Sequence, residues 1–240
     1  MKSTKNVAVL FTGGKDSTFA IEKLRNLGFE IACLISITSE NSDSYMLHTP
    51  NIRMTELSAK ALDLPIVFGS SKGVKEEELR DIQSSVLEAR KEYSFDYLGS
   101  GGLSSEYQRS RLEKIANEIG LGSIAPLWGI SQRNYIEDLV IKNAYSFILT
   151  SVSSGGLGQK WLGKIIDVEA VRELLSLSSK YQFNAAFEGG EAETLVLDCP
   201  LFLSERIEIV ESEKTWDGFR GNLAIKKARL IDKKNASPRG

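Results

Sequence analysis

The residues best suited to chemistry form the segment Thr-Gly-Gly-Lys-Asp-Ser at 12–17, which follows an apolar run at 7–11 and precedes a helical pattern. The first turn of a helix presents N–H groups without intrahelical partners and the positive end of the helix dipole, so an anion is stabilised there. Gly13 and Gly14 allow a positive φ and a close approach of the backbone to a ligand. The segment therefore predicts a phosphate site.

The other four residues of this segment have side chains that suit a phosphate group. Thr12 and Ser17 offer hydroxyl donors, and Lys15 offers a positive charge. Asp16 could hold a bound Mg2+ or cap the helix. A glycine turn capped by Asp16, with no ligand, is the simpler alternative.

Two common phosphate-binding patterns do not fit these residues. A Walker A loop needs Lys directly before Ser or Thr, and here Asp16 separates Lys15 from Ser17. A dinucleotide fingerprint needs three spaced glycines, and here two are adjacent. The segment instead resembles the Ser-Gly-Gly-x-Asp-Ser loop of the ATP pyrophosphatase superfamily, with Thr12 in place of the first serine. That resemblance implies cleavage of ATP between its α and β phosphates and transfer of AMP to an oxygen of the substrate.

A second cluster lies at 187–194, where Glu188, Glu191 and Glu193 surround a Gly-Gly turn. Such a segment is often only a solvated acidic loop. If it faces a cleft, it is instead a candidate substrate site. The sequence leaves both readings open.

Alternating strands and helices are expected to position the first cluster. Apolar runs predict five strands, at 7–11, 31–37, 65–68, 97–98 and 124–127. Helical spacing predicts a helix between each pair of successive strands. The first follows residue 14, the second begins near residue 49, the third spans 75–93 and the fourth follows residue 102. This order predicts an α/β fold: a Rossmann-like parallel five-stranded sheet with helices on both faces. Ligands bind at the carboxyl ends of such strands. Gly13-Gly14, the segment 39–51 and Gly101-Gly102 all follow strand ends.

Beyond Trp128 the pattern changes to a smaller mixed α/β domain. Helices are predicted at 131–143 and 167–181, and strands at 147–152, 194–197, 207–210 and 223–231. We therefore predict an ATP-binding domain at 1–126, a substrate domain at 127–232 and a flexible tail at 233–240.

Composition narrows the class of protein. The chain is 42% hydrophobic and 26% charged, with a net charge of −2, so no global charge favours nucleic acid. Cys33, Cys199 and the single histidine, His48, offer neither a zinc spacing nor a disulfide framework. No apolar run of transmembrane length and no signal-peptide core are seen, which predicts a cytoplasmic protein without membrane contact.

Six motifs in one order resemble the diphthine-ammonia ligases, from Val7 to about Leu230. They are Thr-Gly-Gly-Lys-Asp-Ser at 12–17, Tyr-Met-Leu-His-Thr-Pro-Asn at 45–51, Ser-Glu-Tyr-Gln-Arg-Ser-Arg-Leu-Glu at 105–113, Pro-Leu-Trp-Gly at 126–129, Trp-Leu-Gly at 161–163 and Glu-Gly-Gly-Glu-Ala-Glu-Thr at 188–194. Phe187 departs from the family, in which glycine is expected.

The resemblance implies ATP-dependent amidation of diphthine on elongation factor 2, with ammonium as nitrogen donor and AMP and pyrophosphate as products. ATP and Mg2+ are the implied cofactors, with Asp16 as a magnesium contact through pyrophosphate. The ATP contacts expected are Thr12, Gly13, Gly14, Lys15, Asp16, Ser17 and Gly101, and the catalytic residues expected are Lys15, Asp16, Glu188 and Glu191. The substrate contacts expected are Tyr45, His48, Asn51, Tyr107, Arg109, Glu188, Gly190, Glu191, Glu193 and Thr194.

Diphthine carries a trimethylammonium group, which suits a carboxylate or an aromatic face such as Tyr45 or Trp128. One of the glutamates could instead bind ammonium and take its proton. The sequence leaves these roles open, as it does a homodimer. It offers no glutaminase nucleophile, so free ammonia is the expected donor unless a partner supplies it.

Two other functions compete with the ligase. Another pyrophosphate-loop enzyme, such as a tRNA-modifying ligase or thiolase, predicts a basic extension or a cysteine pair, and neither is seen. A non-catalytic nucleotide-binding module would leave the acidic segment at 188–194 unexplained.

Overall fold

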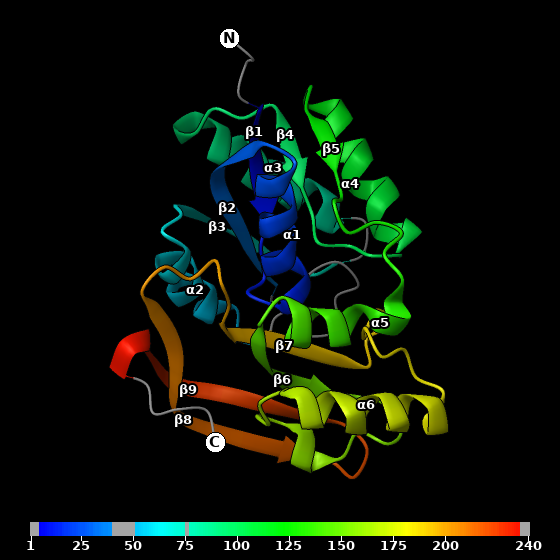
Figure 1. Ribbon diagram of the computed structural model, residues 1–240. Coiled ribbons are helices and arrows are strands. Elements are labelled where there is room, and N and C mark those ends of the chain that lie inside the picture. Colours follow the sequence, from blue (N-terminus) through cyan, green and yellow to red (C-terminus); the bar gives the residue numbers. More distant parts are fainter. Residues whose placement is uncertain (1–4, 40–50, 75–76, 236–240) are drawn as a thin grey trace. The chain divides into compact units, whose positions relative to one another are not determined.

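The computed structural model describes residues 5–39, 51–74 and 77–235. Its contacts divide the chain into two compact units, one formed by residues 1–55 and 64–130 and the other by residues 56–63 and 131–240 (Figure 1). The domain limits predicted from the sequence stay predictions.

The first unit is built on a parallel sheet with strand order β3-β2-β1-β4-β5. The strands are β1 (Lys5–Leu10), β2 (Phe29–Ser39), β3 (Ile66–Ser71), β4 (Tyr97–Gly99) and β5 (Gly122–Ile124), and the helices are α1 (Lys15–Asn26), the 3-10 turn η1 (Ile52–Met54), α3 (Glu77–Glu92) and α4 (Glu106–Glu118). The predicted fold class is confirmed. The order reverses at β1, so the loops after β1 and β4 meet at the switch point where α/β sheets bind ligands.

Helices cover both faces of this sheet. Cys33, Ile35 and Ile37 of β2 join one buried cluster with apolar side chains of α3 and α4. On the other face, an added Cβ at Gly99 would meet Leu24 of α1 and Val7 of β1. Because successive side chains of a strand point to opposite faces, α1 packs on the face away from α3 and α4.

The fifth strand lies earlier than predicted. It spans Gly122–Ile124 rather than 124–127. Pro126 has no N–H to donate to a ladder, and Trp128 N donates to Ala125 O over 3.1 Å, so the chain turns there. The missing Cβ of Gly122 leaves room for the Tyr97 ring, which would otherwise lie 2.6 Å away.

The second unit contains an antiparallel sheet with strand order β7-β6-β9-β8. Its strands are β6 (Ser146–Val152), β7 (Ala192–Asp198), β8 (Glu205–Trp216) and β9 (Gly221–Asp232), and its helices are α2 (Thr55–Leu62), α5 (Gln132–Glu137), the π-helical turn η2 (Asp138–Lys142), the 3-10 turns η3 (Gln159–Trp161) and η4 (Lys233–Asn235), and α6 (Val168–Tyr181). The mixed α/β character predicted for this region is confirmed.

Two helical predictions need correction. The helix predicted at 131–143 is α-helical only to Glu137, because Asn143 N bonds Asp138 O over 3.0 Å in a π-type turn. The start of the helix predicted near 49 lies outside the described residues, and α2 begins later, at Thr55.

Lys233, the first residue of the predicted tail, contacts the segment between β7 and β8. The Lys233 ammonium donates to Cys199 O at 2.9 Å and to Phe202 O at 2.8 Å, and it lies 2.8 Å from Asp198 Oδ1. Lys233 is therefore anchored to that segment, and the flexible tail stays a prediction.

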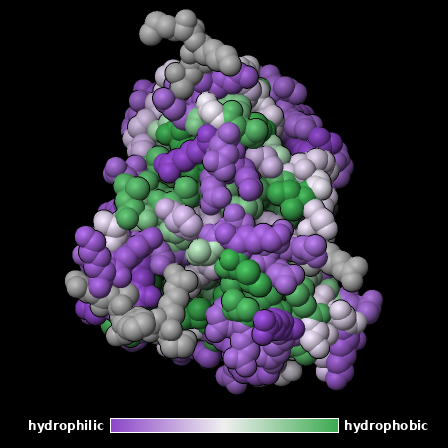
Figure 2. All heavy atoms as spheres, in the orientation of Figure 1, coloured by the Kyte–Doolittle hydropathy of each residue, from purple (hydrophilic) through white to green (hydrophobic). Residues whose placement is uncertain are grey.

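The surface mixes polar and apolar side chains, as Figure 2 shows for one face. Hydrophilic residues cover much of that face and hydrophobic patches interrupt them, which is ordinary for folded proteins. Within the described ranges, no helix has both the length and the apolar character needed to cross a membrane.

Candidate functional site

The phosphate loop lies between β1 and α1, as predicted. Gly13 has φ = 74°, and Gly14 is the N-cap of α1 with extended backbone angles. Because Gly14 has no side chain, the first turn of α1 carries no side-chain cap from its N-cap residue. The backbone N–H groups and the helix dipole are thus arranged for an anion.

A cluster of hydroxyls shapes this loop. Thr12 Oγ1 and Ser17 Oγ lie 3.2 Å apart, and Ser17 Oγ donates to Gly14 O over 3.2 Å. Gly14 N donates to Thr12 Oγ1 over 3.4 Å. Thr12, the departure from the superfamily pattern, therefore supplies its hydroxyl as a serine would.

Lys15 and Asp16 form an ion pair at the start of α1. Lys15 Nζ lies 2.7 Å from Asp16 Oδ2, with side chains 3% and 27% exposed. The Lys15 amine is buried next to the anion-binding turn, while the Asp16 carboxylate reaches solvent. This pair can neutralise a phosphate and hold a cation that accompanies it.

Gly101 packs directly on this helix start. A Cβ added at Gly101 would lie 2.6 Å from the carbonyl carbon of Asp16 and 2.7 Å from Ser17 N. At Gly102 an added Cβ would meet nothing within 4 Å. The structure therefore brings Gly101, predicted as an ATP contact, against residues 16 and 17, and the role that it shows for this glycine is close backbone packing.

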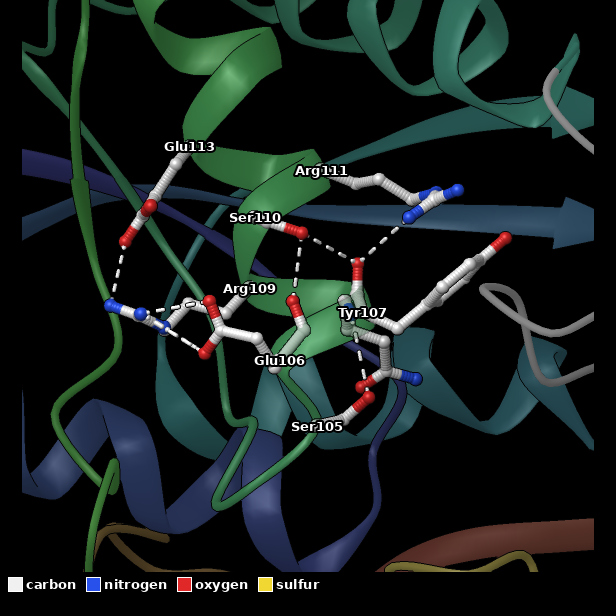
Figure 3. Close-up of polar contacts among 8 residues, drawn as sticks. Ser105, Glu106, Tyr107, Arg109, Ser110, Arg111 and Glu113 are labelled. Atoms are coloured by element: carbon white, nitrogen blue, oxygen red, sulfur yellow. Dashed lines mark hydrogen bonds and ion pairs between the residues drawn. The ribbon is translucent and has the colours of Figure 1, made fainter.

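The N-terminal turns of α4 carry two arginines in defined positions (Figure 3). Ser105 caps the helix by accepting from Gln108 N over 3.4 Å. Arg109 Nη2 lies 3.0 Å from both carboxylate oxygens of Glu106, and its Nη1 lies 3.1 Å from Glu113 Oε1. Two carboxylates thus hold the Arg109 guanidinium.

Both arginines also stack on aromatic rings. The Arg109 guanidinium carbon lies 4.5 Å from the centroid of the Trp128 ring, and that of Arg111 lies 3.4 Å from the centroid of Tyr107. A cation from the substrate would therefore compete with Arg109 for one face of Trp128. Substrate roles for Tyr107 and Arg109 stay predictions.

The predicted substrate contacts around residue 48 are described only in part. Tyr45 and His48 lie outside the described residues. Asn51 has φ = 63°, and its carbonyl accepts from Met54 N over 2.7 Å. This turn leads the chain into η1.

The acidic loop at 187–194 belongs to the second unit, whereas the phosphate loop belongs to the first. Glu191 Oε1 accepts from Asn184 N over 3.0 Å, and Glu191 Oε2 accepts from Gly189 N over 2.8 Å. Ser153 N donates to Glu191 O over 2.8 Å, and Ser153 Oγ donates to Gly190 O. The Glu191 carboxylate therefore ties the loop together; a catalytic role stays a prediction.

We predict that Glu191→Ala lowers the free energy of unfolding by about 1–3 kcal/mol, because two backbone N–H groups lose their acceptor. Glu191→Gln keeps one acceptor oxygen and should lie between Ala and wild type. Urea unfolding measures both. If Gln restores stability without restoring product formation, the carboxylate also takes part in the reaction, whereas wild-type stability of Glu191→Ala would contradict its role in the loop.

The other acidic-loop candidates flank a strand irregularity. Gly190 has φ = 79°. On β7, Glu193 pairs with Ser151 and Thr194 pairs with Leu149 of β6, so Thr150 is an extra residue in the ladder. Bulges of this kind redirect side chains and are frequent beside active sites. Asn184 and Ser153 are further partners of this loop that the sequence does not indicate, since neither has a spacing that links it to Glu191.

Phe187, the departure from the family pattern, adopts a conformation that favours glycine. Its φ is 63°, in the left-handed region, and it is only 5% exposed. Its ring stacks on Phe183 with centroids 6.4 Å apart and planes 18° apart. The backbone thus takes the turn that a glycine would make easily, and buried aromatic packing offsets the strain.

This conformation predicts that a glycine variant at residue 187 is more stable than an alanine variant, the reverse of the usual order. Phe187→Ala should lose about 3–5 kcal/mol of stability through lost packing, and Phe187→Gly should be about 1 kcal/mol more stable than Phe187→Ala because glycine relieves the positive φ. Denaturant midpoints measure the difference. Phe183 is buried but has no positive φ, so there the alanine variant should be more stable than the glycine variant. The same order of stability at both residues would contradict backbone strain at Phe187.

Comparisons with known proteins match nearly the whole chain. Residues 5–123 match the diphthamide synthase N-terminal domain, and residues 131–231 match the diphthamide synthase C-terminal domain. A diphthine–ammonia ligase of Mus musculus is 30% identical over 225 residues, which cover 86% of this chain and 84% of the mouse protein. The human protein of the same name is 29% identical with the same coverage.

Other relatives are longer or more distant. A diphthine–ammonia ligase of Schizosaccharomyces pombe is 32% identical over 220 residues, which cover 85% of this chain but 36% of the yeast protein. This chain therefore spans about a third of that relative and most of the mammalian ones. A solved structure described as a predicted subunit of tRNA methyltransferase from Methanocaldococcus jannaschii aligns with a TM-score of 0.42 and 21% identity, covering 83% of this chain and all of that one. That similarity is too low to carry an argument about function.

Proposed function

This chain belongs to the diphthamide synthase family, and we propose that it is the ATP-dependent ligase that converts diphthine on elongation factor 2 to diphthamide. The diphthine carboxylate attacks the α phosphorus of ATP and pyrophosphate leaves. Ammonia then attacks the carbonyl carbon of the acyl adenylate and loses a proton, and the amide forms as the C–O bond breaks and AMP leaves. The ligase class predicted from the sequence is confirmed by the family.

The observation that carries the proposal is the glycine turn at the start of α1. Gly13 has φ = 74°, and Gly14 leaves the first turn of the helix without a side-chain cap. This geometry suits the phosphates of ATP, because backbone dipoles aimed at developing charge stabilise a departing pyrophosphate. Lys15, buried beside the turn, would add a positive charge where the P–O bond breaks.

The residues also fit a magnesium ion that arrives with the nucleotide. Across the described part of the chain, no group of three or more His, Cys, Asp or Glu side chains could hold a metal by itself. Asp16 is half-buried at the anion-binding turn and would contact Mg2+ together with phosphate oxygens. The ion would supply further charge neutralisation to the leaving pyrophosphate.

The two cysteines support ammonia as the nitrogen donor. Burial raises the pKa of Cys33 to about 12 and that of Cys199 to about 11. A glutaminase nucleophile must be a thiolate near neutral pH, and neither residue meets that need. We therefore infer that ammonium is the donor unless a partner supplies the ammonia.

The acidic loop is our candidate for the diphthine side chain. Glu188, Glu191 and Glu193 are the candidates for binding a trimethylammonium group or taking a proton from ammonium, and Glu191 also accepts from two backbone N–H groups. Four other expectations stay predictions: that elongation factor 2 docks on this chain, that the chain forms a homodimer, that it has no nucleic-acid or membrane partner, and that it is cytoplasmic.

A labelling assay tests the function. Purified protein is mixed with Mg-ATP, 15N-ammonium and elongation factor 2 carrying diphthine, and AMP, ADP and label in the factor are followed. AMP with label in the factor is the expected result. AMP without label would keep the ATP chemistry and change the substrate, and no AMP under any condition would favour a nucleotide-binding module.

A further inference from the structure

An open cavity lies in the second unit between α5, the C-terminal half of α6 and the segment that follows α6. Its volume is about 510 Å3, and small-molecule sites occupy roughly 300–1,000 Å3. Both helices belong to the second unit and contact each other (Figure 1). The residues that line the cavity are chiefly polar and include Asn134, Glu137, Leu175, Ser178, Ser179 and Asn184.

The lining comes from one face of each helix. Asn134 and Glu137 are three residues apart on α5, and Leu175, Ser178 and Ser179 occupy the i, i+3 and i+4 positions of α6. Side chains at these spacings share one face of a helix. The cavity is therefore bounded by two helix surfaces that face each other.

The charge of the lining is negative. Glu137 has a carboxylate, and no lining residue that the structure describes has a positive charge. Lys142 of η2 lies 2.7 Å from Asp138 Oδ1 and pairs with that carboxylate. Across the described ranges, neither the Glu137 carboxylate nor the Asn134 side-chain amide has a hydrogen bond or an ion pair. The cavity thus favours a cation over an anion.

The hydroxyl of Ser178 restricts the kind of cation. Ser178 Oγ donates to Phe183 O over 2.6 Å, so its hydrogen is engaged and it can only accept a hydrogen bond from a ligand. An ionised Glu137 carboxylate likewise only accepts. A ligand that complements both groups carries a positive charge and donates hydrogen bonds, as an ammonium group does, whereas a quaternary ammonium has no N–H to donate.

The size of the cavity favours an amine that carries a carbon chain. An ammonium group is similar in size to a water molecule, which takes about 30 Å3. Most of the 510 Å3 is thus left for the rest of a ligand. Leu175, which is partly buried in the α6 wall, offers an apolar contact for methylene groups.

We propose that this cavity binds a primary aliphatic amine, with its ammonium group bound by Glu137 and Ser178 and its carbon chain packed on Leu175. The inference goes beyond the proposed function, since it needs neither ATP nor diphthine. Asn184 connects the cavity to the acidic loop, because Asn184 N donates to Glu191 Oε1 over 3.0 Å. We therefore expect the environment of the Glu191 carboxylate to change when the cavity is occupied.

A titration followed by NMR locates the ligand and measures its affinity. The 15N-labelled protein is titrated with butylammonium chloride, and saturable shifts are expected at the amides of Asn134, Glu137 and Asn184. Glu137→Gln should weaken binding at least tenfold, because a charge-assisted hydrogen bond is lost. Glu169→Gln is the matched control, since Glu169 is an exposed glutamate of α6 outside the lining, and it should bind butylammonium as the wild type does.

Two further ligands test what the cavity recognises. Tetramethylammonium has no N–H and should not bind; binding as tight as that of butylammonium would contradict recognition by hydrogen bonds. Ammonium chloride should bind more weakly than butylammonium, and equal affinity would assign the site to the ammonium ion and exclude a contact of the chain with Leu175. The proposal is overturned if butylammonium causes no saturable shifts at the lining residues, or if Glu137→Gln binds it as tightly as the wild type.

Discussion

Lys15→Met is expected to lower the rate of AMP formation about 100- to 1,000-fold, the usual cost of removing one donor aimed at charge that develops in a transition state. Lys15 is nearly fully buried at the start of α1, with its ammonium 2.7 Å from Asp16. Methionine replaces most of the buried stem without the charge, so packing is largely kept. The loss should appear in kcat more than in KM, because the added charge on pyrophosphate develops as the bond breaks.

Arg25→Ala is the matched control for this variant. Arg25 lies on the same helix, in its last turn, and is exposed, so its loss should leave AMP formation within about twofold of wild type. The measurement is steady-state AMP release with diphthine-bearing elongation factor 2 and ammonium. If Lys15→Met forms AMP at the wild-type rate and has the wild-type unfolding temperature, the charge of Lys15 does not contribute to catalysis.

Hydrophobic periodicity and turn residues predicted the strands and helices of the first unit, because in most of them the local sequence pattern agrees with the structure that forms. The apolar run at 31–37 lies within β2, and the helix predicted after Gly14 begins at Lys15. Periodicity and turn residues suffice for such elements, since β1 and β2 contain continuous runs of buried residues. The strand predicted at 124–127 moved to Gly122–Ile124 because apolar character alone cannot tell a strand from a buried turn at Pro126.

The contacts within the candidate sites could not be predicted in this way. The positive φ of Phe187 depends on its stacking against Phe183, and no spacing rule foresees that packing. The sequence marks Glu191 as acidic and exposed, whereas the fold uses its carboxylate as an acceptor for two backbone N–H groups. Tertiary contacts thus decide which polar residues of a motif are available for a ligand.

The role of Gly101 also depends on a tertiary contact, its packing against the first turn of α1. Gly101→Ala should lower the free energy of unfolding by about 1–3 kcal/mol and weaken Mg-ATP binding at least tenfold. The added Cβ would lie 2.6 Å from the carbonyl carbon of Asp16 and 2.7 Å from Ser17 N. These are backbone atoms of the first turn of α1, so the clash is relieved only by moving the turn that binds phosphate.

Gly102→Ala separates this contact from a general effect of glycine. Neither glycine has a positive φ, and an added Cβ at Gly102 meets nothing within 4 Å. Both substitutions stiffen the unfolded chain equally, so Gly102→Ala should keep wild-type stability and wild-type Mg-ATP affinity. Urea unfolding and calorimetric titration of the two variants measure the difference. Similar behaviour of both would mean that the loop after β4 yields without disturbing α1, and the close packing of Gly101 would then not shape the nucleotide site.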